Sequence, residues 1–122
     1  MENKKTIMLK TALINENAVM VMGSYLDNGN LYLWFESEIG EPLTTVTVNF
    51  EDKLPPFQAY IKDYSENMGT LDFLLGNGFG KVIGERRSGF VMCPLFLFNE
   101  ERLKEFDEAG FEEYKAQNTN NL

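Results

Sequence analysis

The segment from Leu74 to Gly89, LLGNGFGKVIGERRSG, has the composition of a loop that binds phosphate. It contains five glycines, one lysine and two adjacent arginines. Glycines let the backbone amides approach a phosphate closely, and lysine and arginine side chains supply positive charge. A phosphate site here would place the chain among the nucleotide-binding proteins.

The spacing of these residues fits neither common nucleotide motif. A P-loop needs G-x-x-x-x-G-K-[S/T], but Leu75 stands five residues before Gly80 and Val82 takes the place of the magnesium-binding hydroxyl. A dinucleotide fingerprint counted from Gly78 would need a glycine where the chain has Ile83. That fingerprint also follows a strand and opens a helix, whereas here a helical pattern comes first.

We therefore interpret the glycines as structural. Gly76 or Gly78 ends a helix through a left-handed residue, and Gly84 and Gly89 shape a hairpin around the sequence ERRS. A small-molecule or nucleotide-binding domain that uses the Gly76–Gly89 region is kept as the alternative interpretation.

Arg86, Arg87 and Ser88 are candidates for binding an anion. A turn at ERRS would push both guanidinium groups into solvent, where they could hold a carboxylate or a phosphate. The alternatives are a solvated loop and a salt bridge to the acidic C-terminal helix. No neighbouring residue completes a reaction centre, so only binding is predicted.

The residue types offer little for catalysis, and we predict that the protein is not an enzyme. The chain has no histidine, which removes the usual general base and zinc ligand. Cys93 lies in VMCPLFLF and is interpreted as a buried apolar residue. Glu36 and Glu38 share a strand face without the spacing of a calcium loop. No metal site and no cofactor are predicted.

The C-terminal segment has the clearest electrostatic character. The whole chain carries a formal net charge of −8. Between Asn99 and Lys115 there are seven acidic and three basic residues, which gives this segment a local net charge of −4. Acids in the first turn suit the helix dipole, but acids farther along gain nothing from it. We predict that a group of carboxylates faces a basic protein partner, namely Glu105, Glu108, Glu112 and Glu113.

The negative charge also bears on other partners. Such a chain repels nucleic acid and anionic membranes, so neither is expected as a partner. Tyr25, Tyr32, Trp34 and Phe35 could stack bases, but the basic groove that accompanies such a platform is missing, and core or interface packing is favoured. No apolar run reaches the length of a membrane span and no signal-peptide core follows the N-terminus, so we expect a cytoplasmic protein. The oligomeric state is not predicted.

The pattern of elements predicts an α+β fold in one domain, residues 1–122, with a frayed polar tail at 116–122. We expect a mainly antiparallel sheet of about six to seven strands with two short helices packed on one face. Asn28-Gly29 predicts a hairpin; if the turn is two residues long, Leu26 faces Leu31 and Tyr25 faces Tyr32. One helix ends at Gly76, and the other begins with Asn99 as its N-cap. The expected strands include TIMLKTALI, AVMVMGSYL, LYLWFES, LTTVTVNF (Leu43–Phe50) and FQAYIKDY.

Two stretches, EPLTTVTVNF and GFGKVIGERRSGFVMCPLFLFNEERLKEF, resemble a family of short bacterial proteins of unknown function, number 4313 in that series. The resemblance spans Tyr25 to Phe106. Members share a TVN strand, a glycine region and a YPLYxF strand, which stands here as CPLFLF with Phe96 and Phe98 in the aromatic places. Where the family has TGR this chain has IGERR, so the family's arginine corresponds to Arg86 or Arg87.

The resemblance implies a genetic context and no catalytic residues. Members of the family are accessory proteins of conjugative and other mobile DNA, whose small acidic proteins often block host nucleases. We predict a small acidic, non-enzymatic protein-interaction domain of a mobile genetic element. An inhibitor of a host defence nuclease, of the anti-CRISPR or anti-restriction type, is the specific form that such a protein could take.

Overall fold

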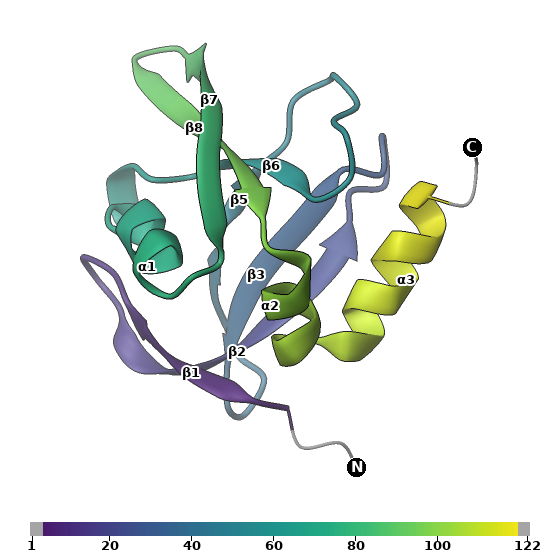
Figure 1. Ribbon diagram of the computed structural model, residues 1–122. Coiled ribbons are helices and arrows are strands. Elements are labelled where there is room, and N and C mark those ends of the chain that lie inside the picture. The colour runs from purple at the N-terminus through teal and green to yellow at the C-terminus, as the bar shows by residue number, and fades with distance from the viewer. Residues whose placement is uncertain (1–3, 120–122) are drawn as a thin grey trace.

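The computed structural model describes residues 4–119. Within them, eight strands form two four-stranded sheets and three α-helices pack beside them (Figure 1). All strand pairs are antiparallel, so the predicted α+β class with antiparallel pairing is confirmed. The elements are β1 (Thr6–Lys10), β2 (Asn15–Ser24), β3 (Leu31–Ser37), β4 (Pro42–Thr45), β5 (Thr47–Val48), β6 (Gln58–Ile61), a 3-10 turn η1 (Ser65–Asn67), α1 (Thr70–Gly76), β7 (Gly80–Ser88), β8 (Val91–Phe98), α2 (Glu100–Phe106) and α3 (Glu108–Thr119).

The first sheet has the order β1-β2-β3-β4. Because side chains alternate across a strand, β2 and β3 each place apolar residues on two opposite faces. The inner face is fully buried and carries Ala18, Met20, Met22, Leu31, Leu33 and Phe35. The outer face is half-buried and carries Val19, Val21, Tyr32 and Trp34. The first sheet therefore covers the core with one face and leaves an aromatic face outward.

The predicted hairpin between β2 and β3 is present, but its loop is four residues long. Ser24 pairs with Leu31, and the Tyr25 amide donates to the Asn30 carbonyl oxygen at 2.9 Å. Within this loop only Gly29 has a positive φ, 77°, so a two-residue type I′ turn does not form. The expected pairing of Leu26 with Leu31 is wrong by two residues, and Leu26 is fully exposed.

The predicted strand Leu43–Phe50 passes from one sheet to the other. Val46 donates its amide to the carbonyl oxygen of Leu33 in the first sheet (2.9 Å), and its own carbonyl accepts from the amide of Lys62 beside the second sheet (2.8 Å). This buried residue separates β4 from β5. The second sheet then has the order β5-β6-β8-β7, with β7 at an edge.

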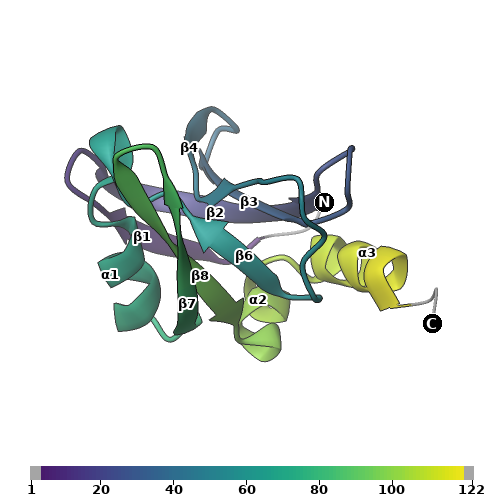
Figure 2. The same ribbon diagram turned by 90° about the horizontal axis from the view of Figure 1, so that it is seen from above.

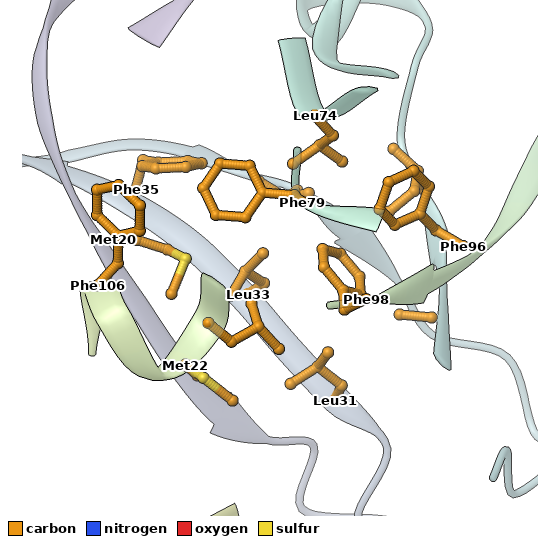
Figure 3. Packing of buried hydrophobic residues seen from close by; sticks show 14 of the residues in the cluster. Met20, Met22, Leu31, Leu33, Phe35, Leu74, Phe79, Phe96, Phe98 and Phe106 are labelled. Carbon is orange, nitrogen blue, oxygen red and sulfur yellow. The ribbon is translucent and has the colours of Figure 1, made fainter. Parts of the chain in front are cut away.

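The helices and the second sheet lie on the same side of strands β1 to β3 (Figure 2). Phe79, Phe106 and Leu74 meet Met20 and Leu33 of the inner face in one continuous core (Figure 3). Where one C-terminal helix was predicted there are two, because Asp107 separates α2 from α3. Asn99 caps α2 as predicted, since its side chain accepts the amide of Glu101 at 3.1 Å.

The polar segment that was expected to fray begins inside a helix. Helix α3 extends to Thr119, and the Asn118 side chain donates to the carbonyl oxygen of Tyr114 at 2.9 Å. Residues 120–122 lie outside the described part of the chain. Between residues 4 and 119, no helix has both the length and the apolar character that crossing a membrane requires.

Candidate functional site

The glycine-rich segment forms a helix end and a strand, not a phosphate loop. Gly78 follows α1 with φ 73°, which confirms the predicted left-handed helix end. Gly80 opens β7 with φ 153°, and a Cβ there would collide with the carbonyl oxygen of Leu97. Both glycines therefore have backbone roles: Gly78 ends α1 in the left-handed region, and Gly80 allows β7 to pack closely against β8.

The arginine pair lies on a strand, so its expected position in a turn is wrong. The β7–β8 connection is the two residues Gly89 and Phe90, because Ser88 pairs with Val91. Arg86 and Arg87 are consecutive in β7 and therefore point to opposite faces. They cannot close on one anion as a pair, and Ser88 shares its face with Arg86 alone.

Arg86 has partners within the molecule. Its guanidinium carbon lies 4.2 Å from the centre of the Phe50 ring, and Nη1 lies 3.5 Å from Oδ2 of Asp52. The salt bridge to the C-terminal helix considered from the sequence is thus made with the loop after β5 instead. Arg87 is exposed. Six residues of strand, about 20 Å, separate Gly80 from Arg86, so the glycines and the arginines do not converge on one site.

The acidic residues of α2 and α3 are partly neutralised by the other end of the chain. Glu105 pairs with Lys5 beside β1 and with Arg102, whose Nη1 lies 2.8 Å from Oε1. Lys4 lies 3.3 Å from Oδ1 of Asp107. Counting these two lysines changes the net charge of the segment from −4 to −2. The count along the sequence therefore overestimated the local field.

The four predicted carboxylates do not share one face. Glu105 and Glu108 border a hollow of about 160 Å³ that also contains the side chains of three lysines, Lys4, Lys5 and Lys104. Glu112 lies on the next turn, with Oε1 3.7 Å from Nζ of Lys104. Glu113 lies on another side of α3. The structure thus brings three of the candidates near one lysine cluster and separates the fourth.

Glu113 borders a cleft in the surface. This cleft of about 390 Å³ lies between the β2–β3 hairpin and α3. Its walls include Ser24, Tyr25 and Gln117, and Ser24 Oγ donates to Oε1 of Gln117 at 3.1 Å. Leu26, also in the lining, is fully exposed. A carboxylate beside hydrogen-bonding groups and an apolar rim can receive a basic side chain of a partner.

Asp107 was counted in the charge of the C-terminal segment, but its side chain is buried. Only 4% of its surface is exposed, and its oxygens accept the amides of Met22 in β2 (3.0 Å) and Gly110 in α3 (3.2 Å). A Cβ on Gly110 would collide with this carboxylate. The sequence signal for this role was an Asp three residues before Gly110, the spacing of a helix N-cap.

Burial raises the pKa of one thiol and two phenol groups among the described residues. It raises the pKa of the Cys93 thiol, and Arg86, its partner across the ladder, opposes this shift. Cys93 is fully buried, as predicted. Burial likewise raises the pKa of the Tyr25 and Tyr114 hydroxyls, which bond to Thr47 and to the Phe57 amide. Residues 4–119 contain no group of three or more potential ligands that could hold a metal ion.

The outer face of the first sheet carries an arrangement that the sequence did not predict. The rings of Tyr25, Tyr32 and Trp34 form a row: Tyr25 stacks on Tyr32 with ring centres 4.7 Å apart, and the Trp34 ring is tilted against Tyr32 at 4.6 Å. The indole Nε1 of Trp34 donates to Oε2 of Glu36 at 2.9 Å. Glu36 and Trp34 stand two residues apart on β3 and so share a face, a spacing that could have indicated the contact.

Comparison with known families gives one match. The model of a family described as Domain of unknown function (DUF4313) matches residues 19–118. The match extends beyond both ends of the resemblance predicted from the sequence. No curated protein and no solved structure matches the chain.

Proposed function

The chain belongs to the DUF4313 family, and we propose that this member is a small acidic interaction domain of a mobile genetic element that binds a basic protein surface. Its partner, in this proposal, is a host defence nuclease of the CRISPR or restriction type in the cytoplasm. The protein acts by binding and not by catalysis.

The exposed carboxylates of the two C-terminal helices carry this proposal. Helices α2 and α3 pack against each other along the side of the molecule (Figure 1). Lys104 and Lys115 are the exposed bases on the same helices. On these two helices, the exposed acids without an ion pair to a described residue are Glu100, Glu101, Glu108 and Glu113, and Glu112 contacts Lys104 at a longer 3.7 Å.

The charge of this surface fits the chemistry of a nuclease. Enzymes that hold DNA do so in channels lined by lysine and arginine, because each phosphate carries a negative charge. An acidic protein that occupies such a channel competes with DNA directly. The cleft beside Glu113 adds a place where one basic side chain of the partner inserts.

A cleavage assay tests the proposal. Purified defence nucleases, both RNA-guided and restriction types, are incubated with their DNA substrates in the presence of the protein. We expect inhibition of at least one nuclease that decreases as salt rises, because opposite charges steer the association. The triple variant Glu108→Gln, Glu112→Gln and Glu113→Gln is expected to inhibit less.

A matched variant separates the local surface from the total charge. Glu51, Asp72 and Glu85 are exposed, lie outside α2 and α3, and have no ion pair among the described residues. Replacing them with Gln, Asn and Gln removes the same three charges and is expected to leave inhibition unchanged. Absence of inhibition throughout the panel, or equal loss in both triple variants, contradicts the proposal.

The alternative function is tested with nucleotides. If the Gly76–Gly89 region binds a small molecule, adding ATP, GTP or NAD shifts the amide resonances of Gly78, Lys81 and Arg86 in a saturable way. The separation of the glycines from the arginines along β7 favours unchanged spectra.

A further inference from the structure

Four cations in this protein use the same kind of receptor, an aromatic ring beside a carboxylate. Arg86 lies over Phe50 and reaches Asp52. Arg102 lies 4.9 Å from the Phe106 ring centre and pairs with Glu105. The remaining two sets are Lys5 with Phe106 and Glu105, and Lys62 with Tyr64 and Glu66. A ring face attracts the cation and the carboxylate accepts its hydrogen bonds, so the two contacts reinforce each other.

The three receptors are Phe50 with Asp52, Phe106 with Glu105 and Tyr64 with Glu66, and Trp34 with Glu36 forms a fourth pair of this kind. The indole N–H donates to the Glu36 carboxylate at 2.9 Å, which fixes the acid beside the ring. Trp34 lies over Gly23, since its ring atoms come within 3.5 Å of where a Cβ of Gly23 would stand. Among residues 4–119, no lysine or arginine lies over the Trp34 ring, and Glu36 has no ion pair.

Exposed carboxylates lie near this pair, beyond the end of β3. Glu38 and Glu41 follow β3 and line a hollow of about 350 Å³ with Glu16 at the start of β2, and none of the three has an ion pair within the described part of the chain. Lys10 is the base that the alternation of β1 places on this face. The helices and the second sheet lie on the opposite side of strands β1 to β3 (Figure 2).

We infer that the outer face of the first sheet binds an arginine side chain of a protein partner, with Trp34 stacking on the guanidinium and Glu36 accepting its hydrogen bonds. Arginine suits the site better than lysine because its planar group can stack on the indole and hydrogen-bond the carboxylate together. The aromatic row could also stack bases, but Glu36 beside Trp34 and the exposed carboxylates of Glu38 and Glu41 that follow it along the chain repel a phosphate backbone. This inference does not depend on the proposed contact through α2 and α3.

Titration with oligo-arginine and oligo-lysine peptides of equal length tests the inference. Trp34 is the only tryptophan of the chain, so its fluorescence reports on this face directly. We expect a saturable change with oligo-arginine at a lower Kd than with oligo-lysine. Glu36→Gln is expected to raise the Kd for oligo-arginine by about two- to fivefold, the range of an exposed ion pair.

Two variants keep the experiment decisive. Glu85→Gln removes one exposed charge on β7, away from both proposed binding surfaces, and is expected to leave the Kd unchanged. Trp34→Ala, followed by anisotropy of a labelled peptide and checked for folding by circular dichroism, is expected to weaken binding by a similar factor to Glu36→Gln. Equal effects of Glu36→Gln and Glu85→Gln, equal affinity for the two peptides, or tighter binding of single-stranded oligothymidylate would each overturn the inference.

Discussion

Replacing Asp107 with Ala should destabilise the fold more than any other removal of a carboxylate from the C-terminal segment. The change leaves the buried amide of Met22 without an acceptor, which costs about 1–3 kcal/mol. It also removes the side-chain cap from the Gly110 amide at the start of α3, about 1 kcal/mol. The Lys4 pair adds less than about 1 kcal/mol, because the Lys4 side chain is 37% exposed.

The expected loss in the free energy of unfolding is therefore about 2–5 kcal/mol, a large fraction of the stability of a small domain. Urea unfolding followed by circular dichroism and by Trp34 fluorescence measures it. Asp107→Asn keeps one acceptor oxygen and should lie between Asp107→Ala and the wild type. Glu108→Gln, one residue on and exposed, should change stability by less than about 0.5 kcal/mol. If Asp107→Ala matches Glu108→Gln, the carboxylate does not join α2 and α3 to β2 as described.

Two further predictions concern backbone and burial. Gly80→Ala should destabilise the fold by about 2 kcal/mol or more, because φ is 153° and the added Cβ meets the backbone of Leu97. Gly76→Ala has open space around the added Cβ and should be neutral or stabilise the fold by up to about 1 kcal/mol. Thermal unfolding of both variants compares them. Burial raises the pKa of Tyr114 above its model-compound value of 10.0, so the folded state holds this proton more tightly and the free energy of unfolding should fall as pH rises above about 10. Tyr114→Phe should reduce that fall in alkaline urea titrations, and an unchanged slope would contradict the assignment.

The hairpins show how far local sequence can predict this fold. Asn28-Gly29 predicted the position of the first hairpin correctly, but the loop length depends on hydrogen bonds from Asn28 and Asn30 to the segment 49–54. In the second hairpin Gly84 was taken as a turn residue, whereas it follows a bulge at Ile83 within β7. Glycine is common both in turns and at bulges within strands, so its presence alone could not show whether Arg86 and Arg87 lie in a turn or on a strand.

The sequence shows the net charge of the C-terminal segment, but it did not show which of its acidic side chains are exposed and unpaired. Helical periodicity continues through Asp107, and only the contact with β2 turns this residue inward. Lys4 and Lys5 come from the opposite end of the chain, so no window of sequence could show that they neutralise Asp107 and Glu105. Tertiary contacts therefore decide which acidic side chains are buried or paired and which remain exposed.

The association rate constant between this protein and a nuclease that it inhibits tests the central claim most directly. Measured at low and at high salt, the rate for the wild type should be fast and should fall steeply, since exposed charges are screened beyond about 10 Å at 0.1 M salt. The variant with Gln at positions 108, 112 and 113 should associate more slowly at low salt and approach the wild type at high salt. Equal rates for the two proteins at both salt concentrations would contradict binding through the acidic surface of α2 and α3.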